Sequence, residues 1–96
     1  MKPKVSPGKW VLTLGVFRKC KTDASFDKYV NSCINRYILC DWGEVHLVDS
    51  AVNDKALEAQ CGRITARYLS PLDGYEIYII TKFGQNTTTI LLPDEL

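Results

Sequence analysis

The segment that decides the fold is GRITARYLSPLDGYEIYIITKFGQNTTTILLP, residues 62–93. Ile, Thr and Tyr dominate its longer runs, and Gly, Pro, Asp and Asn separate them, which is the pattern of strands joined by short turns. This pattern predicts a three-stranded antiparallel meander with strands at residues 63–69, 75–82 and 87–92. Three strands with one apolar face are stable only when another element covers that face, so the rest of the chain is expected to supply the cover.

The clearest helical signal precedes the meander. Thr22 or Asp23 is a suitable N-cap, because a side-chain oxygen there accepts hydrogen bonds from the backbone N–H groups of the first turn. Apolar residues then recur at intervals of three and four positions, which places them on one face of an α-helix. They are Phe26, Tyr29, Val30, Cys33, Ile34, Tyr37 and Ile38. This helix is the expected lid of the sheet, and Gly43 is expected to end it or to turn the chain after it.

Residues 9–17 form the first candidate strand. Their apolar residues crowd together instead of alternating, which suits a strand covered on both faces or one that passes into a turn at Gly15. Residues 18–21 are then expected to be a polar connection. Residues 44–48 are open to two interpretations, a short edge strand or an extended linker.

A second, shorter helix is expected after residue 48. Asp49 or Ser50 is a suitable N-cap, the helix runs through Gln60, and Gly62 is placed to end it. Its inner side is expected to carry Val52, Ala56 and Ala59. The predicted order is β-α-α-β-β-β, which describes one small α+β domain over residues 1–96, with two helices covering an antiparallel meander.

The composition is that of a soluble globular protein. The chain has 96 residues, of which 46% are hydrophobic and 24% charged, which is enough for one modest core. No run approaches the roughly 18 apolar residues that a membrane span needs. The basic N-terminus leads into no apolar stretch of the signal-peptide type. We therefore expect a cytoplasmic protein with no membrane partner.

The residue inventory predicts neither a metal site, nor a cofactor, nor a catalytic centre. Cys20, Cys33, Cys40 and Cys61 include no Cys-x-x-Cys pair, so the usual zinc and dithiol spacings are absent, and free thiols in the core are expected. His46 lies between apolar residues and is expected to be half-buried and structural. The glycines of the meander stand singly at predicted turns and form no phosphate-binding loop, and no nucleophile turn surrounds a cysteine.

The charge is distributed unevenly along the chain. The net charge is +1, yet the first 22 residues carry six basic residues and no acid. Residues 1–8 are expected to be a flexible basic arm. Basic residues near an aromatic ring can combine phosphate contacts with base stacking, whereas a solvated terminus and a Trp side chain in the core are the plain alternatives. The candidates for this interface are Lys2, Lys4, Lys9, Trp10, Arg18, Lys19 and Lys21.

Short motifs in the later two-thirds of the chain carry a family resemblance. In chain order they are Asp41-Trp42-Gly43, Asn53-Asp54, Ala56-Leu57, Gly62-Arg63-Ile64, Ala66, Tyr68, Ile77-Tyr78-Ile79-Ile80-Thr81, Thr88-Thr89-Ile90-Leu91-Leu92-Pro93 and Glu95. In order and spacing they resemble a family of small, uncharacterised bacterial proteins encoded on plasmids, phages and other mobile elements. The resemblance spans about 55 residues and implies a fold and a genomic setting, but no catalytic residues. The chain departs from the family at residues 82–86, where an acidic and basic turn is usual, and in its N-terminal arm.

The motif residues have a structural interpretation and a functional one. Trp42 can wedge between helix and sheet with its indole N–H bonded to a carbonyl, and Asp41 can cap the turn. Asn53 or Asp54 can bond to the backbone or to Arg63. Alternatively, Asp41, Asn53, Asp54 and Arg63 converge beside Trp42 on a pocket for a small polar ligand.

The leading functional hypothesis is a non-enzymatic protein-binding module of a mobile element. Small proteins in that setting resemble the inhibitors that phages and plasmids direct at host defence nucleases such as CRISPR effectors, so a host protein is the expected partner. Residues 23–96 carry six basic and eleven acidic side chains, so their net charge is −5. A negative charge suits a nucleic-acid channel lined with Lys and Arg. The alternatives are a nucleic-acid-binding accessory protein that uses the basic arm, and a small-ligand sensor or enzyme around Trp42. The sequence gives no oligomeric state.

Overall fold

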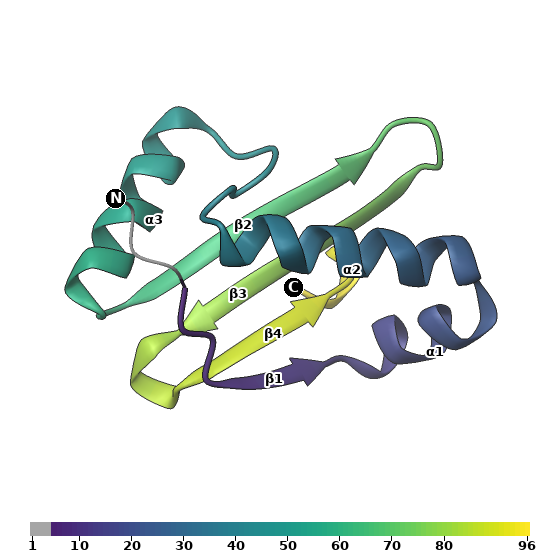
Figure 1. The fold of residues 1–96 in the computed structure, drawn as a ribbon, viewed down its shortest axis with the longest axis horizontal. Coiled ribbons are helices and arrows are strands. Elements are labelled where there is room, and N and C mark those ends of the chain that lie inside the picture. The colour runs from purple at the N-terminus through teal and green to yellow at the C-terminus, as the bar shows by residue number, and fades with distance from the viewer. Residues whose placement is uncertain (1–4) are drawn as a thin grey trace.

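The computed structural model describes residues 5–96, which form a four-stranded mixed sheet with α-helices packed against it (Figure 1). Its strands are β1 (Lys9–Leu12), β2 (Arg63–Ser70), β3 (Tyr75–Lys82) and β4 (Thr87–Leu91), and its α-helices are α1 (Leu14–Thr22), α2 (Ala24–Ile38) and α3 (Leu47–Ala59). Short 3-10 turns follow at Phe83–Gln85 and Pro93–Glu95. The α+β class is confirmed, with one helix more than predicted among the described residues.

The predicted meander is confirmed. β2, β3 and β4 pair antiparallel in sequence order, while β1 lies beside β4 and runs parallel to it, so the sheet order is β1-β4-β3-β2. Successive strand residues point to opposite faces, and the residues of one face are buried. These are Ile64, Ala66, Tyr68, Ile77, Ile79, Thr81, Thr88 and Ile90.

α2 covers this face and supplies most of the helical contribution to the core (Figure 1). Asp23 is its N-cap, as the sequence predicts, and the side chain accepts a hydrogen bond from the Phe26 N–H at 3.1 Å. The predicted apolar stripe faces the sheet, with Phe26, Val30, Cys33 and Tyr37 buried. The helical period of apolar residues therefore identified the lid correctly.

The prediction of a strand over residues 9–17 is wrong beyond Leu12. The Thr13 N–H makes the last backbone bond to β4, to the Ile90 carbonyl at 3.1 Å. The Thr13 hydroxyl then accepts from the Val16 N–H at 3.3 Å, and this N-cap begins α1. Residues 18–21, expected to be a connection, belong to this helix.

The second predicted helix exists, but its start and its orientation differ from the prediction. α3 begins at Leu47, so residues 47–48 are helical, and it ends at Ala59. Gln60 is its C-cap and adopts the left-handed conformation with φ 52°, before Gly62 is reached. Its buried residues are Asn53 and Leu57. Ala56 also packs against the core, whereas Val52 and Ala59, expected on the inner side, are exposed.

Residues 5–8 pack against the domain and are not part of a flexible basic arm. Val5 is 5% exposed, and its N–H donates to the Ile38 carbonyl at 3.4 Å. The Pro7 carbonyl accepts from the Thr88 hydroxyl at 2.7 Å. The expected flexible arm is therefore wrong for these residues, and Lys2 and Lys4 lie outside the described part of the chain.

A chain of buried hydroxyl groups connects α2 through the sheet to this segment. The Tyr37 and Thr81 oxygens are 2.5 Å apart, and the Thr81 and Thr88 oxygens are 2.7 Å apart. Because the Pro7 carbonyl can only accept, Thr88 donates to it, Thr81 donates to Thr88 and Tyr37 donates to Thr81. All three buried hydroxyls are thereby satisfied.

The described helices also bear on membrane insertion. Within residues 5–96, none of them combines the length and the apolar character required to cross a bilayer.

Candidate functional site

Trp42 and Asp54, two of the predicted site residues, are bonded to each other. The indole Nε1–H donates to Asp54 Oδ1 at 3.0 Å, so the acceptor is a carboxylate and not the expected carbonyl. Trp42 is only 3% exposed, and its ring meets the Tyr37 ring edge-on at a centroid distance of 5.4 Å. Trp42 therefore joins α2 to α3 within the core.

Asn53 closes part of the outer edge of β2. Its side-chain Nδ2 donates to the Thr65 carbonyl at 2.8 Å, and its Oδ1 accepts from the Thr65 N–H at 3.1 Å. The amide thus imitates a neighbouring strand at one residue of an edge that otherwise has unpaired backbone groups. Asn53 is buried, which makes both bonds necessary.

Residues 42–44 close the next part of the same edge. The Arg67 N–H donates to the Trp42 carbonyl at 3.1 Å, and the Glu44 N–H donates to the Arg67 carbonyl at 2.6 Å. Gly43 lies between them with φ 76°, and a Cβ atom there would lie 2.1 Å from the Arg67 carbonyl oxygen. Only glycine permits this approach, so the Asp-Trp-Gly motif has a backbone reason.

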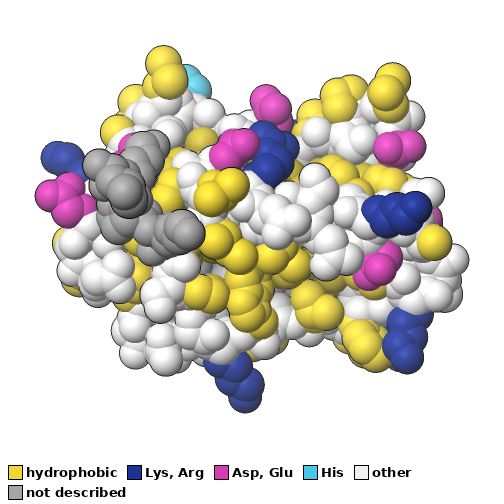
Figure 2. All heavy atoms as spheres, in the orientation of Figure 1, with side chains coloured by type: hydrophobic (Ala, Val, Ile, Leu, Met, Phe, Trp, Pro, Cys, Tyr) yellow, Lys and Arg dark blue, Asp and Glu magenta, His cyan; other side chains and the backbone are white. Residues whose placement is uncertain are grey.

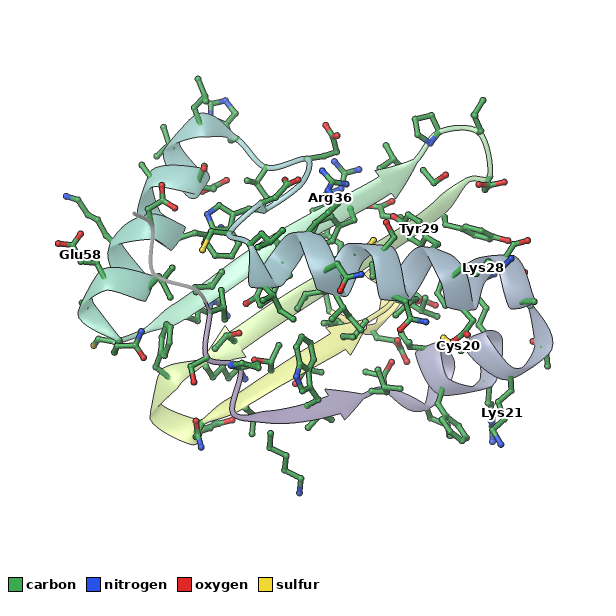
Figure 3. All side chains as sticks on the ribbon, in the orientation of Figure 1. Cys20, Lys21, Lys28, Tyr29, Arg36 and Glu58 are labelled. Atoms are coloured by element: carbon green, nitrogen blue, oxygen red, sulfur yellow. The ribbon has the colours of Figure 1, made fainter. Side chains whose placement is uncertain are left out.

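Asp41 fixes the turn that leads into this segment. One carboxylate oxygen accepts from the Gly43 N–H at 3.0 Å, and Arg36 Nε donates to the other at 2.8 Å. The Arg36 guanidinium lowers the pKa of the Asp41 carboxyl below its ordinary value. Arg36 extends from α2 towards β2 (Figure 3) and lies 5.1 Å from the centre of the Tyr68 ring. The Tyr68 hydroxyl in turn donates to the Asp41 carbonyl at 2.7 Å, and burial raises the pKa of this phenol.

Arg63 does not join the other predicted residues. It is exposed and forms no hydrogen bond or ion pair with any described residue. A cavity of about 380 Å³ lies beside this edge, and its lining includes none of the five predicted residues. It is lined by Glu44, Val45, His46, Asp49, Thr65, Arg67 and Tyr78. Asp41, Trp42, Asn53 and Asp54 therefore act as the edge closure of β2, and Arg63 is separate from them.

The burial of His46 and of the cysteines agrees only partly with the prediction. His46 is exposed and is the N-cap residue of α3, without a side-chain capping bond, so the expectation of a half-buried residue is wrong. Cys33 and Cys40 are buried, but Cys61 is exposed. Burial raises the pKa of the Cys33 thiol to about 11, which keeps it protonated and unreactive at neutral pH. Among residues 5–96, no three His, Cys, Asp or Glu side chains gather in a group that could hold a metal ion.

The described residues of the predicted basic interface are dispersed. Trp10 packs edge-on against the Tyr37 ring at 6.5 Å, so it is a core contact and not a stacking platform in an arm. Lys19 lies over the Phe26 and Tyr75 rings, and Lys21, which projects from α1 in Figure 3, lies over Phe17. Arg18 is exposed on α1 and Lys9 on β1.

The outward face of α3 is the feature that the sequence interpretation missed. Leu47 is 85% exposed, Val48 65% and Val52 55%, and Ala51 is exposed beside them. Residues at i, i+1, i+4 and i+5 share one face of a helix, so these four side chains form a single patch, which we call the α3 patch. Figure 2 shows hydrophobic side chains at the surface over α3. The signal was present in the sequence, but the convention that apolar residues point inward assigned Val52 to the core.

A scan of protein-family models, a search of curated proteins and a search of solved structures each found no match to this chain. The resemblance to a mobile-element family thus stays a prediction that rests on the quoted motifs.

Proposed function

We propose that this domain is a non-enzymatic protein-binding module and that its partner docks on the α3 patch. The supporting observation is the orientation of α3, which buries Asn53 and Leu57 against the sheet and leaves Leu47, Val48 and Val52 in solvent. Large apolar side chains that gather on one exposed helix face are typical of interaction surfaces, whereas single exposed apolar residues need no explanation.

The charges around the patch indicate what kind of partner fits it. Glu44 precedes α3, Asp49 lies in its first turn, and Glu58 points outward near its end (Figure 3), so these three acids outnumber Lys55, the one Lys or Arg of the helix. A helix that exposes several apolar side chains on one face is commonly bound in an apolar groove, and opposite charge at the rim favours the correct partner. We therefore propose a partner that has an apolar groove with a basic rim.

Within this proposal, the partner is a host protein and the class that we favour is a host defence nuclease. The motif resemblance to mobile-element proteins supports this choice, as does the basic surface that nucleases present to nucleic acid. An inhibitor of this kind acts by occupying a surface and requires no catalytic group of its own. The arm-based alternative is weaker, because Trp10 packs against Tyr37.

The test compares two triple variants in affinity capture from host lysate, with nuclease added and at high salt. One removes the α3 patch (Leu47→Ser, Val48→Ser, Val52→Ser). The matched control removes three exposed apolar side chains elsewhere (Leu12→Ser, Leu14→Ser, Phe17→Ser). A captured protein is then purified, and its affinity for each variant is measured by calorimetry.

We expect the patch variant to bind at least about tenfold more weakly than wild type, since interface anchors contribute more than about 1 kcal/mol each. The control variant should bind like wild type. Equal binding by the patch variant would contradict the proposal, as would self-association through the patch in sedimentation. Recovery of nucleic acid alone, lost when salt is raised, would also contradict it.

A further inference from the structure

A row of basic side chains crosses the sheet on the face opposite α2. Residues paired across neighbouring strands point to the same face, and the register pairs Lys9 with Thr87, Thr87 with Lys82, and Lys82 with Arg63. This face is the one away from the core, because the next residues along the strands, Trp10, Thr88, Thr81 and Ile64, pack towards α2 or are buried. Lys9, Lys82 and Arg63 are exposed. We call these three cations the basic row.

The basic row breaks a rule of strand pairing. Arg63 and Lys82 are direct cross-strand partners, and like charges placed opposite each other are unfavourable. The Phe83 N–H donates to the Gly62 carbonyl at 3.0 Å, which makes the adjacent Arg63–Lys82 pair one without mutual backbone bonds. In such pairs the Cα atoms are only about 4.5 Å apart and the side chains are close.

No acidic side chain among the described residues neutralises this pair. Arg67, two rows along the same strand, shows the contrast, because its Nε lies 2.6 Å from a Glu76 carboxylate oxygen. Arg63, Lys82 and Lys9 form no ion pair with any residue in 5–96. Local violations of pairing rules without a compensating contact are expected at functional positions.

We propose that the basic row binds the phosphate backbone of single-stranded nucleic acid. Four strands at a spacing of about 4.8 Å make the row about 14 Å long, which suits a short stretch of backbone. Exposed, unpaired cations release counterions when they meet phosphates, and this is the main source of such affinity. The inference concerns a different face from the α3 patch, so it stands or falls independently of the proposed function.

The remainder of the face indicates a single strand and not a duplex. The next row holds Val11, Thr89, Ile80 and Thr65, and the row after it holds Tyr78, which is partly exposed. A pleated surface has no helix to insert into a duplex groove, whereas a Tyr ring offers a stacking surface that an unpaired base can reach. Glu44 and Asp49 line the same hollow as Tyr78, and Glu76 pairs with Arg67, so this end of the face can receive an unpaired base, while the phosphates lie on the basic row.

The experiment measures binding of a labelled oligonucleotide of about 15 nucleotides by fluorescence anisotropy, between about 50 and 200 mM salt. The test variant is the double substitution Arg63→Glu, Lys82→Glu. The matched control is Lys28→Glu, Lys55→Glu, which changes the net charge equally on the exposed sides of α2 and α3; Lys28 is labelled in Figure 3.

We expect the test variant to lose at least about tenfold in affinity, and the slope of log affinity against log salt to fall by about 1.4, or roughly 0.7 for each lost phosphate contact. The control should change affinity by less than about threefold. Tyr78→Leu should weaken oligonucleotide binding by about fivefold or more, but leave heparin binding unchanged.

Three results would overturn the proposal. One is the absence of oligonucleotide binding by wild type at the lowest salt, and another is an equal loss in the two charge-reversed variants. The third is an unchanged affinity of Tyr78→Leu for the oligonucleotide, which would indicate a general polyanion or acidic-protein surface.

The single variant Lys82→Glu separates binding from folding, because it places opposite charges next to each other and should raise the melting temperature while it weakens binding.

Discussion

α2 and α3 pack against the same sheet with different sets of side chains. α2 presents only apolar and aromatic side chains such as Phe26 to the buried face, whereas α3 buries the polar Asn53 beside Leu57. The difference follows from what each helix meets. The face of a sheet is a surface of apolar side chains, but its edge is a line of N–H and C=O groups that require hydrogen bonds.

The comparison shows why a helix beside a sheet edge can carry a polar residue on its buried side. Asn53 takes the place of a neighbouring strand for Thr65, so that position of α3 cannot be apolar without leaving two buried backbone groups unpaired. Leu57 and Ala56 pack on the core from the same side of α3, and the apolar residues on its outward side lie in solvent unless a partner covers them. The composition of α3 is thus explained partly by the edge and partly by the proposed docking.

The largest effect is expected from the apolar contacts of the two helices. Phe26→Ala in α2 removes a fully buried ring and should lower the free energy of unfolding by about 3–5 kcal/mol. Val52→Ala in α3 removes a side chain that is mostly in solvent and should change it by less than about 0.5 kcal/mol. Urea denaturation measures both, and a comparable loss in the two variants would refute the assigned orientation of α3.

A smaller effect is expected from the polar contacts of the two helices. Asn53→Ala strands the Thr65 N–H and C=O at a closed edge, so we expect a loss of about 2–4 kcal/mol. Asn31→Ala, the control on α2, removes only an exposed bond to the Asp27 carbonyl and should be nearly neutral. Hydrogen exchange of the Thr65 amide should accelerate in the first variant alone; unchanged protection would mean that Asn53 is not what closes the edge.

The smallest effect is expected from the helix starts. α2 begins with an Asp23 side chain that accepts from the Phe26 N–H, whereas α3 begins at His46 without a side-chain capping bond. His46→Asp should therefore stabilise the domain by about 0.5–1 kcal/mol, because a carboxylate satisfies a free N–H at the positive end of the helix. Thermal unfolding at neutral pH measures the gain, and a lowered melting temperature would show that the imidazole has another role there.

The sequence predicted well those elements whose local residue pattern matches the surface that they pack against. The meander has strand residues bounded by turn residues, and α2 has an apolar stripe that faces an apolar surface. α1 escaped prediction because Val16 and Phe17 are typical of strands, and only the Thr13 cap and the limit of pairing with β4 make the segment helical. The parallel partner of β1 lies at the other end of the chain, where no local pattern indicates it.

The sequence predicted structural contacts of the motif residues where neighbouring residues share one role, and it did not predict the place of Arg63, which lies on a strand. Trp42, Asn53 and Asp54 cooperate at the β2 edge, and Asp41 fixes the turn as one interpretation proposed. Arg63 is close to them in sequence, but side chains on a strand alternate between faces, and its position points it to the face of the basic row. Only the register of the strands reveals that Lys9 and Lys82 accompany it.

The pairing of β1 with β4 has a consequence for the route by which the chain folds. Lys9 pairs with Thr87, and the Thr13 hydroxyl donates to Glu95 at 2.7 Å, so the first strand of the domain depends on residues that are synthesised much later than the strand itself. Contacts between such distant parts close long loops, which slows folding and places their formation late. While the chain is still growing on the ribosome, α2 can form but the strands that bury its apolar stripe are not complete. Nascent chains of this domain would therefore expose that stripe to chaperones until the last strand has emerged.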